Sequence, residues 1–161
     1  MGVLAGKEMG AERIIAMSRH KGRPELATSY GATDIVADRG DAGVARIKDL
    51  TRGVGADSVL ECVGTQEAMT QAIACARPGG SIGYVGVPHG VMFDGQPMFF
   101  AQRRMLGGPA PVRRFLPDLM SRVLNGKIKP GKVFDFTLPL AIAAGYQAMD
   151  QRLAIKTLLT V

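Results

Sequence analysis

The sequence DSVLECVG at residues 57–64 is a short run of apolar and β-branched residues that ends in a glycine and leads into a helix-like segment. The same order of strand, small-residue turn and helix occurs at residues 13–19, RIIAMSR, and at residues 80–87, GSIGYVGV. A parallel sheet with helical crossovers gives this alternation, and such sheets bind ligands where their strands end. The three stretches therefore predict an α/β fold with a doubly wound parallel sheet.

The first strand and turn of such a sheet are missing from the sequence. Nothing before residue 13 is typical of a strand, and no G-x-G-x-x-G motif occurs. In dinucleotide-binding domains this motif places the pyrophosphate at a helix N-terminus. We expect a chain that opens inside the first helix of such a domain, is marginally stable alone, and binds its cofactor more weakly than about 1 mM. The strands beside the gap are expected to pair with each other or with a partner chain.

Apolar spacing and turn residues predict the remaining elements. Thr65 is an expected N-cap, Gly31 an expected helix end, and Arg77-Pro78-Gly79-Gly80 an expected turn. Helices are expected over residues 2–9, 24–30, 42–51, 66–75, 97–101, 112–125 and 140–152. Strands are expected over residues 13–17, 33–37, 57–62, 81–85, 105–108, 133–138 and 155–161.

The composition excludes several classes of protein. The chain has 161 residues, 47% of them hydrophobic, which is enough for one domain with a core. Its net charge of +6 is spread along the chain without interleaved aromatic residues, so we expect no nucleic-acid partner. No signal peptide and no apolar run near the roughly 20 residues of a membrane span occur. We expect a cytoplasmic protein with no membrane partner.

The residues that could hold a metal or carry acid/base chemistry are few and dispersed. Cys62 and Cys75 form no C-x-x-C motif, and His20 and His89 lie near no serine or cysteine motif. A zinc site needs three or four ligands. We predict no catalytic residue and no metal ligand in this chain.

Ser18, Arg19 and His20 follow the first predicted strand. In dinucleotide-binding folds an acidic residue at this point binds the adenosine ribose of NAD, whereas an arginine accommodates the 2′-phosphate of NADP. The first carboxylate after this strand is Glu25. A hydroxyl and a guanidinium suit a phosphate dianion, so these residues predict NADP rather than NAD, with His20 beside the phosphate. The alternative is a solvated basic turn.

Three other strand exits are rich in small residues. At Glu61–Thr65 the glycine lets the backbone pass close to another group, or it forms a tight turn before a helix cap. Glu61 itself is interpreted as structural. Val85-Gly86-Val87 is followed by a proline, and the exposed backbone groups of this stiff loop could meet a nicotinamide carboxamide. Gly107-Gly108-Pro109-Ala110 is another rigid exit.

Five segments together resemble the cofactor domain of the zinc-dependent medium-chain alcohol dehydrogenases. They are KEMGA at 7–11, IIA at 14–16, YGATD at 30–34, GADSVLECVG at 55–64 and RPGG at 77–80. The resemblance implies a Rossmann fold in a two-domain enzyme. Residues 1–152 would be its NAD(P)-binding domain, incomplete at the N-terminus, and residues 153–161 a strand that returns to the absent catalytic domain.

The resemblance also implies roles for individual residues. It places Ser18 and Arg19 at the adenosine 2′ position and Val63 and Gly64 near the ribose and adenine. Val85 to Val87 and Gly107 to Ala110 would lie near the nicotinamide. Lys156 holds the place of a basic residue that reaches the cofactor phosphates, or it is an exposed strand lysine.

The function implied by the resemblance is the cofactor-binding part of an NADP-dependent zinc-type alcohol dehydrogenase, inactive by itself. Zinc would belong to the intact enzyme, because the family's zinc ligands lie in the absent N-terminal domain. One alternative is a zinc-free quinone or enoyl reductase of the same superfamily. The other is a non-catalytic oligomerising module. A homo-oligomer formed through exposed sheet edges is expected.

Overall fold

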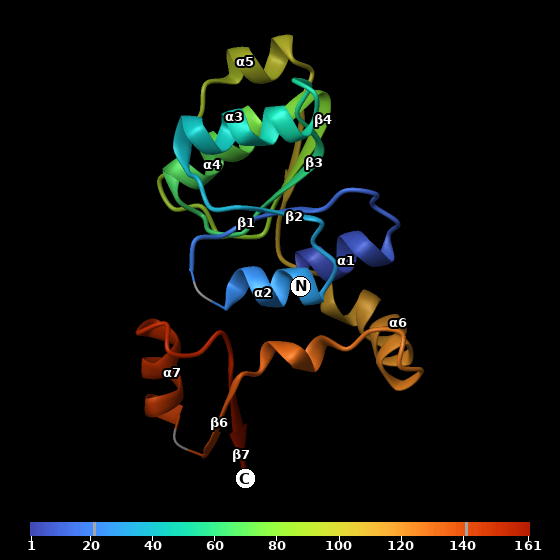
Figure 1. Ribbon diagram of the computed structural model, residues 1–161, viewed down its shortest axis with the longest axis vertical. Coiled ribbons are helices and arrows are strands. Elements are labelled where there is room, and N and C mark those ends of the chain that lie inside the picture. The colour runs from blue at the N-terminus through green and yellow to red at the C-terminus, as the bar shows by residue number, and fades with distance from the viewer. Residues whose placement is uncertain (21, 141) are drawn as a thin grey trace. The chain divides into compact units, whose positions relative to one another are not determined.

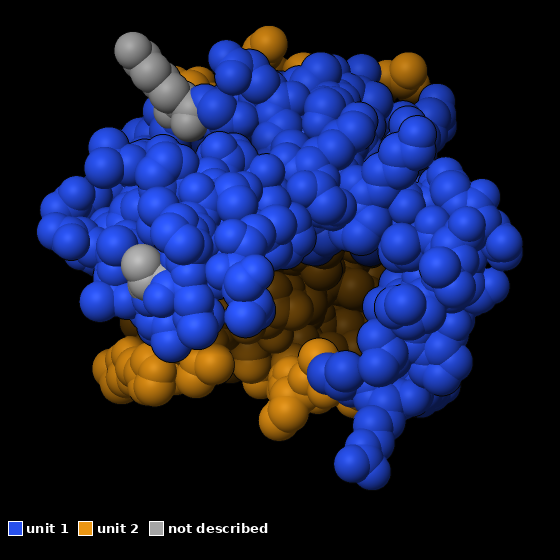
Figure 2. Space-filling view, turned by 90° about the horizontal axis from the view of Figure 1, so that it is seen from below, with its two compact units in different colours: residues 1–35, 112–161 blue, residues 36–111 orange. Residues whose placement is uncertain are grey.

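The computed structural model describes residues 1–20, 22–140 and 142–161, and they form two compact units (Figures 1 and 2). Unit 1 consists of residues 1–35 and 112–161, and unit 2 of residues 36–111. Helices and strands alternate along the chain, and the strand pairings of known register are parallel. The predicted α/β fold with parallel sheets is confirmed.

Unit 2 is built on a parallel sheet in the order β3-β4-β5. Its elements are α3 (Gly40–Leu50), β3 (Ala56–Glu61), α4 (Gln66–Cys75), β4 (Ala76–Tyr84), α5 (Gly95–Phe100) and β5 (Arg104–Gly107). Helices α3 and α4 lie side by side, and α4 packs on β3 and β4 (Figure 1). Buried Ala72 and Ile82 belong to a core against which Val59 and Met105 pack. This packing fixes the three strand exits at one edge of the sheet.

The predicted turn at Arg77–Gly80 is wrong, because these residues lie inside β4. The strand begins at Ala76, which pairs with Ala56, and the register shifts before Ser81 pairs with Ser58. The four residues therefore form a bulge. The Arg77 guanidinium pairs with the Asp57 carboxylate at 2.5 Å, which holds the bulge to the neighbouring strand. Proline and two glycines mark the irregularity correctly but do not end the pairing.

Unit 1 contains two small sheets, β1-β2 and β6-β7. Its elements are α1 (Gly2–Glu8), β1 (Ile15–Met17), α2 (Arg23–Ser29), β2 (Asp34–Val36, which runs on into unit 2), α6 (Val112–Leu124), a 3-10 helix (Pro130–Val133), β6 (Phe136–Pro139), α7 (Ile142–Asp150) and β7 (Thr157–Thr160). Strand β6 starts later than predicted because the 3-10 helix occupies the residues before Phe134. Strands β1 and β3, which flank the predicted gap, belong to separate sheets, so among the described residues they do not pair with each other.

Long-range polar contacts hold unit 1 together. The Tyr30 hydroxyl, at the end of α2, donates to the Pro130 carbonyl at 2.8 Å. The Arg122 guanidinium of α6 lies 3.3 Å from the Glu8 carboxylate of α1. The pKa of Arg122 is raised by its hydrogen bond and charge interaction with Asp118 and, less strongly, by Glu8. These contacts join segments that are far apart in the sequence.

Candidate functional site

The exits of β3, β4 and β5 carry most of the predicted site residues. Because the strands are parallel and adjacent, their carboxyl ends lie at one edge of the unit 2 sheet. The β3 exit holds Val63 and Gly64, the β4 exit Val85 to Val87, and the β5 exit Gly107 to Ala110. The structure therefore places these predicted residues on one edge.

Glu61, the last residue of β3, joins the first two exits. It is 3% exposed, and its side-chain Oε1 accepts hydrogen bonds from the amides of Val63 at 2.6 Å and Gly64 at 2.9 Å. Its main-chain oxygen accepts a hydrogen bond from the Val85 amide at 2.8 Å. One residue thus binds the backbone of both loops.

Two glycines let the same loops touch backbone to backbone. A Cβ at Gly64 would lie 2.6 Å from the Val87 carbonyl oxygen, and a Cβ at Gly86 would lie 2.5 Å from the Gly64 nitrogen. Gly64 also has φ of +83°, which favours glycine. The sequence reading that a glycine here allows close backbone approach is therefore correct, and the segment it approaches is the neighbouring loop.

The loops present apolar side chains to the outside. Val63, Val85 and Val87 are about 70% exposed, at 68%, 68% and 69%. Exposed apolar groups of this kind suit contact with a flat ring. Gly108, Pro109 and Ala110 are exposed as well.

The remaining predicted residues lie in unit 1. Ser18 and His20 are half-buried and Arg19 is exposed, directly after β1. The next glycine, Gly22, lies beside the start of β7, since a Cβ there would be 3.8 Å from Ile155 Cδ1. Lys156 is exposed beside that same isoleucine. The exit of β1 and the lysine predicted to reach the phosphates are therefore on neighbouring segments.

The Asp135 carboxylate fixes the backbone around Lys156. It accepts hydrogen bonds from the amides of Ile155 at 2.9 Å and Lys156 at 3.1 Å. Desolvation raises the pKa of Asp135, but hydrogen bonds from the backbone of Ile155, Lys156 and Asp135 itself outweigh it, so the pKa is lowered. Sequence reasoning missed this residue, because only the fold brings it to β7.

The interpretation of Glu61 as structural agrees with its hydrogen bonds to the Val63 and Gly64 amides, whereas sequence reasoning did not identify the pair of Tyr84 and Gly107. The signal for Glu61 was an acid at a strand end followed by a glycine loop. Tyr84 faces Gly107 in the register of β4 and β5. No local pattern gives that register, so only the structure reveals the pair.

The described residues do not gather ligands for a metal ion. No group of three or more histidine, cysteine, aspartate or glutamate residues is placed to hold one in that part of the chain. Burial raises the pKa of both Cys62 and Cys75, which disfavours the thiolate form that binds metals. Within the same residues, no helix is both long and apolar enough to cross a membrane.

Comparison with known proteins identifies the family of this chain. Residues 1–123 match the zinc-binding dehydrogenase family. The chain belongs to this family. The chain is therefore a cofactor-binding domain of the zinc-type alcohol dehydrogenase family. The family match confirms the resemblance described above.

Individual relatives of this family match nearly the whole chain. A probable zinc-binding alcohol dehydrogenase of Mycobacterium tuberculosis is 37% identical over 147 residues, covering 89% of this chain and 37% of the relative. Zinc-type alcohol dehydrogenase B of Aspergillus flavus is 32% identical over 146 residues, covering 89% of this chain and 34% of the relative. The chain thus spans little more than a third of these relatives.

Solved structures show the same fold. Alcohol dehydrogenase TADH from Thermus sp. ATN1 superposes with a TM-score of 0.90 at 30% identity, over 99% of this chain and 48% of that protein. Benzyl alcohol dehydrogenase from Acinetobacter calcoaceticus gives a TM-score of 0.87 at 26% identity, over 99% of this chain and 45% of that protein. The Rossmann-type assignment is confirmed by these matches.

Proposed function

We propose that this chain binds NADP(H) and forms the cofactor side of a zinc-type alcohol dehydrogenase. In the intact enzyme a hydride would pass between the carbinol carbon of an alcohol and C4 of the nicotinamide. Zinc, which polarises the alcohol oxygen in such enzymes, would be held by residues outside this chain. The part of the chain that the structure describes contributes binding and orientation.

The observation that carries the choice of NADP is the exit of β1. By the resemblance to the family, Ser18 and exposed Arg19 would stand where an NAD-binding domain has a carboxylate. Arginine presents a planar, permanently charged group that suits a phosphate dianion. His20 lies beside them, and Lys156 lies on the adjoining segment at the start of β7.

For the three unit 2 loops, the resemblance to the family supports contacts with other parts of a dinucleotide. Val63 and Gly64 would contact the ribose and adenine side, and the exits of β4 and β5 the nicotinamide. The exposed valines and the tight glycine backbone fit an aromatic ring with an amide substituent. In domain terms, residues 1–152 would form the cofactor domain and 153–161 the strand that returns to a catalytic domain.

Residue-resolved NMR titration of the 161-residue chain tests the cofactor choice, because it detects even millimolar binding. We expect NADPH to shift amide signals at the β1 exit and at the unit 2 loops, and NADH to bind more weakly. Arg19→Ala should weaken the binding of NADPH about tenfold, because it removes one charge-assisted hydrogen bond. The affinity for NADH should be nearly unchanged.

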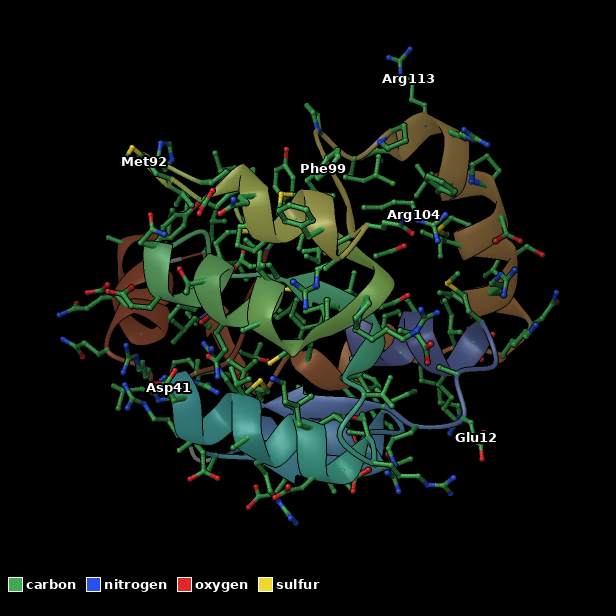
Figure 3. All side chains as sticks on the ribbon, turned by 90° about the horizontal axis from the view of Figure 1, so that it is seen from above. Glu12, Asp41, Met92, Phe99, Arg104 and Arg113 are labelled. Atoms are coloured by element: carbon green, nitrogen blue, oxygen red, sulfur yellow. The ribbon has the colours of Figure 1, made fainter. Side chains whose placement is uncertain are left out.

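The matched control is Arg113→Ala, which removes the same charge from an exposed arginine that points away from α6 (Figure 3). It should leave both cofactors unaffected. Equal losses of NADPH and NADH in the Arg19 variant would contradict the NADP assignment. A chain whose spectrum responds to neither cofactor would contradict the proposed function itself.

We also propose that the free edge of β5 pairs with a second copy of the chain. In the described part of the chain β5 is the outer strand of its sheet, and Leu106 on it is 73% exposed. Open edges of this kind recruit other strands. Sedimentation of the purified chain tests the proposal. A dimer that Leu106→Lys dissociates is expected, and a monomer at all concentrations would contradict it.

A further inference from the structure

Glu61 is the only buried charged residue among the described residues, and its two carboxylate oxygens differ in environment. Oε1 accepts hydrogen bonds from the amides of Val63 and Gly64. Oε2 is buried without a hydrogen-bond partner in the described part of the chain. A buried carboxylate oxygen without a partner is destabilising. A residue needed only to fill space would be apolar, so the loop contacts are the reason for an acid at this position.

The main chain of Glu61 acts on the second loop. Its carbonyl oxygen accepts the Val85 amide, and the Gly86 amide lies 3.4 Å from the same oxygen. Gly64, held by the side chain, meets Gly86 at a distance that excludes any side chain. The side-chain bonds of Glu61 therefore reach the β4 exit through the Gly64–Gly86 contact.

We propose that Glu61 is a positioning residue that holds the β3 and β4 exits together as one cofactor-binding surface. The cofactor role of these exits rests on the proposed function. The carboxylate sets the loop after β3, and the packed glycines transmit that setting to Val85, Gly86 and Val87. Neither loop has its cofactor-binding conformation without the other.

The proposal makes a specific demand on the side chain at this position. Oε1 alone makes both contacts, so a neutral amide oxygen at the same place can replace it. Glutamine offers that oxygen at the same reach and places an NH2 group where the unpartnered Oε2 lies. Aspartate keeps the charge but is one methylene shorter. Reach, and not charge, should therefore decide the outcome.

Amide hydrogen exchange in the 161-residue chain tests the coupling directly. The main-chain acceptor for Val85 remains in every variant, so a faster Val85 or Gly86 amide can arise only through the Glu61 side chain. In Glu61→Ala and Glu61→Asp we expect at least about tenfold faster exchange at the amides of four residues: Val63, Gly64, Val85 and Gly86. In Glu61→Gln the exchange rates of the same amides should stay within about threefold of the wild-type rates.

The controls separate loop release from unfolding. The amides of Ile82 and Met105, in the sheet beneath, should keep their protection. If Glu61→Ala loses that protection too, loop release is judged from Glu61→Asp and Glu61→Gln alone. Both of these variants keep a polar side chain at the position. Faster exchange at Val63 and Gly64 alone would overturn the proposal, and so would an aspartate variant that behaves as wild type.

NADPH titration supplies the second readout. Glu61→Ala should weaken NADPH binding about tenfold, and Glu61→Gln should retain it. Glu67→Ala, at an exposed acid in the first turn of α4, is the matched control and should bind as wild type. Released loops with unchanged NADPH affinity would overturn the positioning role. If the wild type does not bind NADPH, the proposed function fails and the cofactor part of this inference fails with it, while hydrogen exchange still decides the loop coupling.

Discussion

The ring of Tyr84 occupies the space that any side chain at Gly107 would need. The two residues face each other across β4 and β5, at the last pair of the register. Gly107 has no left-handed backbone angle, so packing, and not φ, requires a glycine there. The β5 exit therefore begins beneath an aromatic ring from the neighbouring strand.

Replacing Gly107 by alanine should displace this ring. We expect Gly107→Ala to lower the free energy of unfolding by about 1–3 kcal/mol, the usual effect of overpacking. In a Tyr84→Ala background the same change should have little effect, because the ring is gone. Urea unfolding of the four proteins in this double-mutant cycle measures the coupling. Equal losses in both backgrounds would show that the ring contact is not the cause.

Gly86→Ala should be much more disruptive than the replacement of a glycine that lies in open space. Its Cβ would lie 2.5 Å from the Gly64 nitrogen and 2.7 Å from the Val63 carbonyl carbon, and backbone cannot rotate away as a side chain can. We expect a loss of about 2 kcal/mol or more in unfolding free energy and shifted amide signals in both loops. Gly95→Ala, where no atom lies within 4 Å of the new Cβ, is the control and should be neutral or slightly stabilising.

Asp135 predicts a pH dependence of stability. Because its pKa is lowered in the folded chain, its contribution is present above the unfolded pKa, near 3.9, and is lost as the pH falls through the folded pKa. Asp135→Asn should therefore be less stable than wild type at pH 7, by about 1 kcal/mol or less since the carboxylate is exposed. The difference should shrink below about pH 4.

Thermal unfolding from pH 3 to 7 measures this effect. Glu12→Gln neutralises another exposed carboxylate of unit 1 and is the control (Figure 3). A deficit in the Asp135 variant that is constant with pH would mean that the hydrogen-bond geometry, and not the charge, stabilises the start of β7.

Tyr30→Phe tests the link between α2 and the 3-10 helix. Tyr30 is 5% exposed, and burial raises the pKa of its hydroxyl, which donates to Pro130. Loss of the hydroxyl should lower the unfolding free energy by about 0.5–1.5 kcal/mol without changing the fold. Denaturant unfolding measures this loss, and the m-value of the variant should equal that of the wild type. No loss at all would indicate that water replaces the bond to Pro130.

Local signals in the sequence predicted the elements whose cause is local. Thr65 caps α4 by accepting the Ala68 amide, and Gly31, with φ of +108°, follows the end of α2. The bulge in β4 was misread because its residues have turn chemistry, whereas the Asp57 carboxylate that holds it lies on another strand. Local propensity cannot reveal such a partner.

The candidate site was predictable in outline for the same reason. Glycines at strand exits identified the loops, since parallel strands end at one edge. The contacts between loops were not predictable, because Gly64 meets Gly86 and Gly107 meets Tyr84 only once the strand register is set. The register depends on core packing across the sheet, which a single sequence does not display.

The bulge at Arg77–Gly80 also governs which insertions and deletions the chain tolerates. Ala76 pairs with Ala56, and Ser81 pairs with Ser58, so the residues between Ala76 and Ser81 set the phase of the rest of β4. Ile82 is 1% exposed, and side chains on a strand alternate between faces. Deleting Gly79 would turn Ser81 and Gly83 toward the core and Ile82 away from it. This segment is therefore constrained in length as well as in residue identity, since a Cβ at Gly80 would lie 2.9 Å from the Arg77 carbonyl oxygen.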